Sequence, residues 1–188
     1  MGPEMGPYRP AEELWRFFVA GQLVCLCLVH DAEWAHCSEV ALRLSRRKFT
    51  LEQLDVRCFA ICSVEPGRNA SRAAAAKYSG FLRRWMFTDP YGAPSVLFSV
   101  DQCVKKQLPV AGDKGVALVL VQRTCGCSGS GGEKEGDEKE KEGGGGDCRG
   151  KLTVLHTEVV VSSDSTAIPP RKIDFAIKGL LRAVSKAT

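Results

Sequence analysis

The sequence predicts an α/β protein with one central mixed β-sheet and helices on both faces. The apolar run at 23–30 has the continuous hydrophobicity of a central strand that is buried on both sides, and the run at 56–64 is an apolar stretch typical of a second strand. A helical pattern between them allows a right-handed crossover, which makes these two strands parallel. Later strand patterns at 95–100, 116–123 and 152–161 have no helical pattern between them, so antiparallel pairing is expected there. The predicted architecture is therefore a three-layer sandwich.

Four helices are expected around this sheet. Residues 10–21 have apolar side chains near helical spacing and end at a glycine, and residues 70–81 are rich in alanine. Residues 34–48 and 168–187 are amphipathic, each with one apolar face. The apolar stripe of the last helix consists of Ile173, Ile177, Leu180, Leu181 and Val184.

The length of 188 residues fits a single domain, which is expected to span 11–187 after a flexible N-terminus at 1–10. This domain is interrupted at 124–150 by a segment rich in glycine, glutamate and lysine, without aromatic or aliphatic side chains. Such a segment buries too little apolar surface to offset the entropy lost on ordering. It is expected to be a flexible insertion between two antiparallel strands, where added loop length costs little stability.

Charge and hydropathy argue against two classes of partner. The formal net charge is +4, and the short basic clusters at 46–48 and 83–84 fit a solvated surface better than a nucleic-acid site. No apolar run approaches the roughly 20 residues of a membrane span. Neither nucleic acid nor membrane is therefore an expected partner. The N-terminus has no signal-peptide pattern, so an intracellular protein is expected, cytoplasmic with the mitochondrion as the alternative.

The chain has nine cysteines, and four of them lie within strand-like apolar runs. These four are Cys25, Cys27, Cys58 and Cys62. Free cysteine behaves as a small hydrophobic residue, so the four are expected to fill the core as reduced thiols. This usage indicates a reducing compartment rather than a disulfide framework.

The segment AEWAHC at 32–37 joins the first strand to the second helix. Cys37 begins a helix face that also holds Val40, Ala41 and Leu44. Since the other faces are polar, Cys37 is predicted to point into the core. His36 is expected at the exposed start of the helix, where it could act as a base for the neighbouring thiol. Consecutive helical residues point about 100° apart, which is poor geometry for such a pair.

Two stretches resemble the thioredoxin fold family. In VCLCLVHDAEWAHC a buried strand leads to a tryptophan and a cysteine that opens a helix, and in KYSGFLRRWMFTDPYGAPSVLFSV a helix end precedes a proline loop and a strand. The resemblance implies a thioredoxin-like three-layer sandwich with Pro94 as a cis-proline. Members of the family bind extended protein segments beside this proline. The partner-binding residues that the resemblance implies are Trp34, Ala93, Pro94 and Ser95.

The chain departs from this family at the active site. The family's Cys-x-x-Cys motif places an attacking thiolate at the helix N-terminus and a resolving thiol one turn further along. Here Cys37 corresponds to the resolving position, and Ala35 or His36 occupies the attacking position. Neither alanine nor histidine forms a thiolate, so the active site is degenerate.

The expected function is that of a redox-inactive thioredoxin-like protein, an adaptor or complex subunit that binds a protein partner and uses no cofactor. The alternative is an enzyme or redox sensor that performs single-cysteine thiol–disulfide exchange. In that alternative Cys37 is the catalytic residue and His36 assists it. The two hypotheses differ in one property, because the second requires Cys37 to be accessible and acidic.

Two other groups of residues leave alternatives open. A zinc site could be formed by Cys125, Cys127, Cys148 and His156. Their spacing fits no usual zinc pattern, so loop thiols without a metal are expected, with a disulfide as a further alternative. Trp85 and Phe87 precede the proline loop and are either a docking anchor or core residues.

Overall fold

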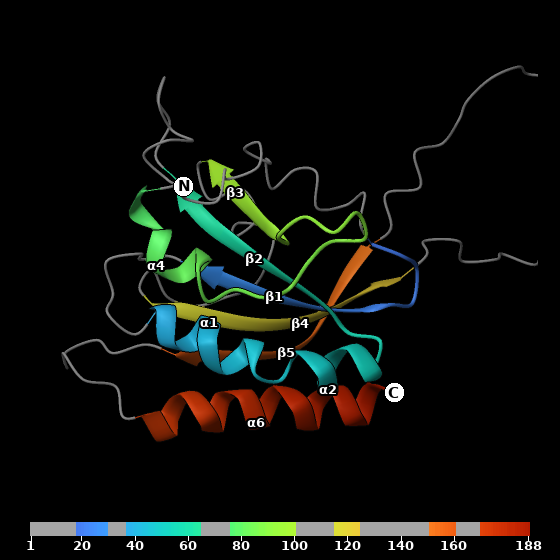
Figure 1. Cartoon of the computed structure of the whole chain (residues 1–188). Coiled ribbons are helices and arrows are strands. Elements are labelled where there is room, and N and C mark those ends of the chain that lie inside the picture. Colours follow the sequence, from blue (N-terminus) through green and yellow to red (C-terminus); the bar gives the residue numbers. More distant parts are fainter. Residues whose placement is uncertain (1–17, 30–36, 65–75, 101–114, 125–150, 161–169) are drawn as a thin grey trace, which may run out of the picture.

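A computed structural model describes residues 18–29, 37–64, 76–100, 115–124, 151–160 and 170–188. The described part of the chain is an α/β structure with a mixed sheet (Figure 1). Its elements in chain order are β1 (Leu23–Val29), α1 (Cys37–Ser45), α2 (Lys48–Gln53), β2 (Arg57–Val64), α4 (Ser79–Leu82), β3 (Val96–Val100), β4 (Val116–Thr124), β5 (Lys151–Val160) and α6 (Pro170–Ala187).

The five strands form one sheet in the order β3-β2-β1-β4-β5. β1 is parallel to β2, with Val24 opposite Arg57 and Val29 opposite Cys62. β4 is antiparallel to both β1 and β5. The predicted parallel pair and the predicted antiparallel pair at the end of the chain are thus confirmed, and β1 is buried along its whole length.

The prediction that β3 pairs antiparallel with its neighbours is wrong. β3 lies parallel to β2 at the far edge of the sheet, and β2 and β1 separate it from β4. Adjacent strands pair as hairpins when their connection is short. Residues 101–115 separate β3 from β4, which is enough chain to cross to the other side of the sheet.

One hydrophobic cluster lies between the sheet and the helices. α1, α2 and α6 run along the same side of the sheet (Figure 1). α1 contributes its predicted apolar face, Cys37, Val40, Ala41 and Leu44, all of them buried. From the predicted stripe of α6, Ile173, Ile177, Leu180 and Val184 are buried and Leu181 is partly buried. Helical periodicity therefore located both of these faces correctly.

A second cluster covers the opposite face of the sheet. Its strand residues include Val24, Leu26 and Leu28, and Phe18 packs on Phe59 with ring centroids 6.5 Å apart. Among the described residues every helix lies on the first face, so a helix on the second face stays a prediction. Residues 18–21 contain a turn and no helix. The remainder of the predicted helix at 10–21 lies outside the described residues.

The other predicted segments are described in part or lie outside the described residues. The helix predicted at 34–48 ends earlier than expected, because α1 ends at Ser45 and a separate helix, α2, begins at Lys48. The 1–10 segment lies outside the described residues, as does 125–150. Thr124 and Lys151, which flank the insertion, face each other in the β4–β5 ladder. The insertion therefore begins and ends at one point of the sheet.

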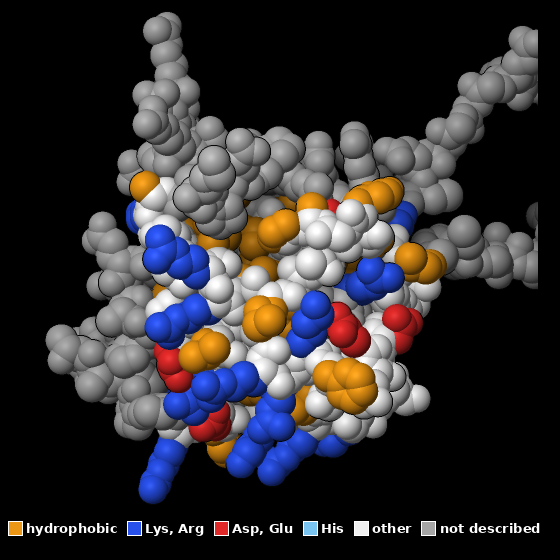
Figure 2. Space-filling view, in the orientation of Figure 1, with side chains coloured by type: hydrophobic (Ala, Val, Ile, Leu, Met, Phe, Trp, Pro, Cys, Tyr) orange, Lys and Arg blue, Asp and Glu red, His pale blue; other side chains and the backbone are white. Residues whose placement is uncertain are grey.

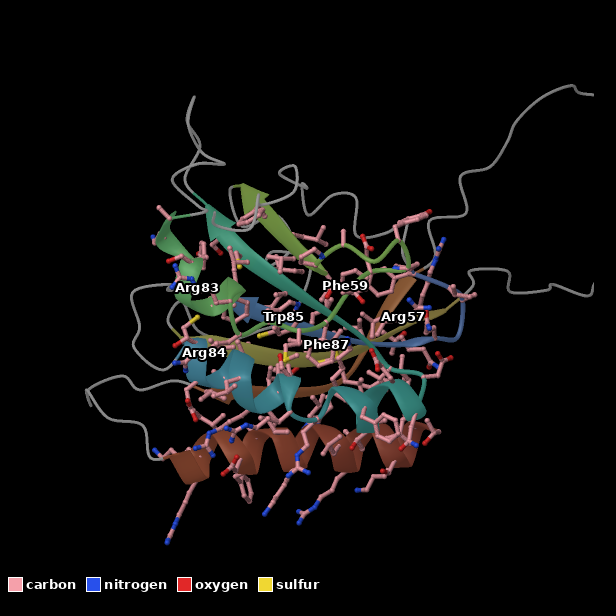
Figure 3. The ribbon with its side chains drawn as sticks, viewed as in Figure 1. Arg57, Phe59, Arg83, Arg84, Trp85 and Phe87 are labelled. Carbon is pink, nitrogen blue, oxygen red and sulfur yellow. The ribbon has the colours of Figure 1, made fainter. Side chains whose placement is uncertain are left out.

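Ion pairs connect the helical layer. The Arg43 guanidinium donates to Asp174 of α6 at 2.6 Å and to Glu39 of α1 at 2.5 Å. Arg84, which follows α4, lies 3.5 Å from the same Glu39 carboxylate, and its side chain is drawn beside α1 in Figure 3. Asp174 is the only acidic residue in the sequence of α6, and this pairing occupies it.

Candidate functional site

Cys37 is the first residue of α1, and its side chain is only 2% exposed. It belongs to the cluster beneath the helices, so the prediction of a core-facing thiol is confirmed. Five cysteines lie in the described part of the chain, all of them buried reduced thiols. They are Cys25, Cys27, Cys37, Cys58 and Cys62. The four strand cysteines therefore fill the core as predicted.

The surroundings of Cys37 favour protonated thiols. Burial raises the pKa of the Cys27 thiol, and the neighbouring thiols of Cys25, Cys37 and Cys62 raise it further. Burial likewise raises the pKa of Cys62, with Cys37 adding to the effect. A thiolate is the reactive form of cysteine, and apolar surroundings disfavour it. The cluster around Cys37 is therefore a poor environment for an attacking thiolate.

The proline loop differs from the thioredoxin-like expectation in its backbone. None of the peptide bonds among the described residues is cis, so Pro94 follows Ala93 through a trans bond. The cis-proline prediction is therefore wrong. The loop is closed instead by a bridge between Thr88 and Pro94 and by the Asp89 carboxylate, which accepts the backbone N–H groups of Tyr91 and Ala93.

The loop also lies at the wrong end of the sheet to share a surface with Cys37. The Ser95 hydroxyl donates to the carbonyl of Cys58, near the start of β2. Cys37 lies near Cys62, at the other end of that strand. In Figure 1 the loop before β3 lies away from the arrowheads of β1 and β2. Because β3 is parallel to β2, the loop that precedes it must lie where the parallel strands begin.

The predicted partner-binding residues are thus not gathered into one site. Ser95 is buried, accepts the indole N–H of Trp85 at 3.1 Å, and cannot contact a partner. Ala93 is half-buried and Pro94 is exposed. Trp34 and His36 lie outside the described residues, and their predicted roles stay predictions.

Trp85 and Phe87 are core residues rather than docking anchors. Both are buried beneath the helical layer, where Figure 3 shows them over the sheet. Their ring centroids are 4.9 Å apart, and Trp85 stacks on Phe81 at 5.4 Å. The exposed aromatic residue of this loop is Tyr91, at the tip.

Asp89 is expected to stabilise the loop through its charge-assisted hydrogen bonds. Asp89→Ala should lower the free energy of unfolding by about 2 kcal/mol, because two backbone N–H groups lose a carboxylate acceptor. Asp89→Asn keeps one amide oxygen as an acceptor and should cost roughly half as much. Urea unfolding of the two variants measures the difference. Equal losses would show that the carboxylate does not act through these bonds.

A groove lies between β5 and α6 in the described part of the surface. It has a volume of about 580 Å³. It is lined by Leu155, His156, Glu158, Phe175, Gly179, Arg182, Ala183, Lys186 and Ala187. Phe175 is 67% exposed and Leu155 is 40% exposed. The prediction from sequence missed this groove, although an aromatic residue outside the apolar stripe of α6 was a signal for it.

Local geometry explains why the groove forms here. The β4–β5 ladder is irregular between Leu120 and Val121, so Leu155 is an extra residue on β5. Such a bulge re-aims side chains, and Leu155 and His156 both line the groove. A β-carbon at Gly179 would overlap the Glu158 carboxylate. Glycine at this position therefore leaves room for the Glu158 side chain against α6.

The polar residues of the groove include a histidine in contact with a glutamate, and two basic residues, Arg182 and Lys186. His156 Nε2 lies 3.0 Å from Glu158 Oε1, so this histidine contacts a carboxylate. The three cysteines proposed as its zinc partners lie outside the described residues. No ion pair joins Arg182 or Lys186 to another residue in the described part of the chain. Their positive charges are therefore available to a ligand.

The helical layer carries a strong excess of positive charge. α6 alone has five Lys and Arg residues against one Asp. Figure 2 shows Lys and Arg side chains spread over the α1 and α6 side of the molecule, with fewer Asp and Glu side chains among them. The net charge of the whole chain is only +4, so the positive charge is concentrated on this layer.

Comparison with models of protein families gives no match to this chain, and comparison with curated proteins gives none either. Within the described ranges, no three His, Cys, Asp or Glu side chains are grouped so that they could hold a metal ion. No helix in the same ranges is both long and apolar enough to cross a membrane.

Proposed function

We propose that this chain is a redox-inactive, protein-binding module of thioredoxin-like architecture, an adaptor or a subunit of a complex. The observation that carries the proposal is the groove between β5 and α6, because it exposes Leu155 and Phe175 together beside an edge strand. Contiguous exposed apolar groups rimmed by polar residues are typical of interaction sites. The mixed sheet with helices supports the architecture.

The properties of the thiols support the redox-inactive part of the proposal. Thiol–disulfide exchange begins with a thiolate that reaches a disulfide sulfur. Cys37 is buried, and two thiols that it influences, Cys27 and Cys62, have pKa values that burial raises. A single-cysteine oxidoreductase would need the opposite arrangement, with an exposed thiol in electropositive surroundings.

The polar end of α1 gives no support for catalysis either. Glu39, in the first turn of the helix, is held by Arg43 and Arg84. Its carboxylate therefore belongs to the ion pairs that connect α1 with the segment after α4. Within the described residues, the groove between β5 and α6 favours association with another protein. The side chains around Cys37 belong instead to the hydrophobic core.

The proposal predicts that Cys37 is dispensable for binding. Cys37→Ala should lower the free energy of unfolding by about 1 kcal/mol, a typical single-site effect, and leave association unchanged. The measurement is lysine cross-linking of the full chain to proteins of a cell extract kept in reductant, followed by mass spectrometry. The wild type and Cys37→Ala should capture the same proteins.

Cys62→Ala is the matched control, since it also removes one buried thiol from the same cluster. A loss of captured proteins with Cys37→Ala but not with Cys62→Ala would contradict the proposal. Capture that disappears in reductant would contradict it as well, because the association would then depend on mixed disulfides.

A further inference from the structure

We propose that the free edge of β5 and the adjoining groove bind an extended, acidic protein segment, which adds to the sheet as a further strand. This inference rests on the proposed function, and it names the chemistry of the partner and the way it binds. The segment would pair its backbone with β5, place an apolar side chain against Leu155 and Phe175, and direct carboxylates toward Arg182 and Lys186.

The backbone of β5 supplies the first part of the site. β5 has 10 residues and is the last strand of the sheet, with β4 on one side. No strand in the described part of the chain pairs with its other side. An edge strand presents backbone N–H and C=O groups that can pair with another chain. Strand addition is a common way to recognise an extended segment.

The side chains of the groove supply the second part. Phe175 and Leu155 come from α6 and β5, and both line the same hollow. Phe175, Gly179, Arg182 and Lys186 lie on successive turns of one helix face, which runs beside the strand. A strand paired to β5 would therefore have alternate side chains directed toward this face, because successive residues of a strand point to opposite sides.

Charge decides which kind of segment fits. The cations at the groove, Arg182 and Lys186, form no ion pair with other described residues, whereas the acidic Glu158 lies against His156. Asp174, the acid of α6, is held by Arg43 at 2.6 Å. The groove thus offers unneutralised positive charge to a ligand. Complementary charges fix orientation and reject partners of like charge.

The same charges argue against a second copy of this chain as the occupant. Pairing β5 with β5 of another copy would bring two α6 helices to the same junction. Each α6 has five basic residues and one acidic residue, so like charges would face each other. An acidic segment of another protein avoids this repulsion and neutralises the helix.

The test measures peptide binding to the full chain by fluorescence anisotropy. One peptide of the length of β5 alternates glutamate with valine, and a second has lysine at every glutamate position. We expect saturable binding of the acidic peptide that is at least about tenfold tighter than binding of the lysine peptide. The NMR signals of the β5 amides should shift on binding, since their outer edge gains hydrogen bonds.

Two pairs of matched variants locate the site. The double variant Arg182→Glu/Lys186→Glu should weaken binding by about tenfold or more, and Arg171→Glu/Lys172→Glu, with the same change of charge on the same helix, by less than about twofold. Phe175→Ala should weaken binding severalfold, while Phe49→Ala, which truncates an equally exposed aromatic on α2, should not.

Three results would overturn the inference. They are an acidic peptide that does not bind, equal losses from the two charge variants, and self-association through β5 that excludes the peptide. None of these results bears on Cys37 or on the capture of proteins by cross-linking, so protein binding through another surface would survive them. Conversely, a loss of captured proteins confined to Cys37→Ala, with peptide binding intact, would contradict the proposed function alone.

Discussion

Replacing Trp85 with alanine is expected to lower the free energy of unfolding by about 3–5 kcal/mol, the usual cost of removing a large buried aromatic side chain. The indole ring is buried between Phe81 and Phe87, with centroid distances of 5.4 and 4.9 Å. Its N–H also donates to Ser95 Oγ, which in turn donates to the Cys58 carbonyl. Trp85 therefore connects the segment after α4 to the start of β2 and β3.

Trp85→Phe is the control for this prediction. It keeps an aromatic ring and removes the indole N–H, so its cost should be smaller, about 1–2 kcal/mol. Urea unfolding followed by circular dichroism measures both variants. A loss below about 1 kcal/mol for Trp85→Ala would mean that the ring is not packed as described. If the alanine variant does not fold, the phenylalanine variant still separates the packing from the hydrogen bond.

The second large effect is a loss of stability at alkaline pH. The pKa values of the Cys27, Cys58 and Cys62 thiols are raised in the folded protein, in each case chiefly by burial. Above the ordinary thiol pKa of about 8.5 the unfolded chain loses these protons while the folded chain keeps them. The contribution to stability is therefore complete below about pH 8.5 and is lost as the pH rises above it.

The size of the effect follows from the unfolded-state pKa. At pH 10 each thiol that stays protonated in the fold costs about 2 kcal/mol, and three such thiols cost about 6 kcal/mol. That loss is comparable to the whole stability of many domains. The measurement is urea unfolding at several pH values between 7.5 and 10, with a reductant present throughout.

The double variant Cys27→Ala/Cys62→Ala isolates this effect from the titration of other groups. It retains one of the three thiols with raised pKa values, so it should lose only about a third as much stability over the same pH range. A dependence as steep as that of the wild type would show that other groups cause it. The comparison does not depend on the absolute stability of either protein.

Local sequence patterns were sufficient to predict several helices and strands and the residues that they contribute to the core. The continuous apolar run of β1 predicted a strand buried on both faces, and spacing at three and four residues predicted the buried faces of α1 and α6. The same spacing placed Cys37 in the core, which is the main observation against thiol chemistry. These properties depend on residues close together in the sequence, so periodicity reports them.

The candidate groove could not be predicted from local periodicity. Leu155 lines the groove because β5 has a bulge, and Phe175 lines it because α6 lies beside β5. The resemblance to thioredoxin-like proteins instead pointed to Pro94, whose loop lies at the other end of the sheet from Cys37. Motif order along the chain does not specify which ends of the strands meet.

The sequence by itself determined the α/β class, the central position of β1, the buried thiols and the core-facing stripe of α6. Only the tertiary structure decided that β3 joins the sheet beside β2, that Pro94 follows a trans bond, and that β5 and α6 enclose a groove. The physical reason is the sequence separation of the residues that interact. Burial patterns arise within single elements, whereas strand order and surface grooves depend on how long connections cross the sheet.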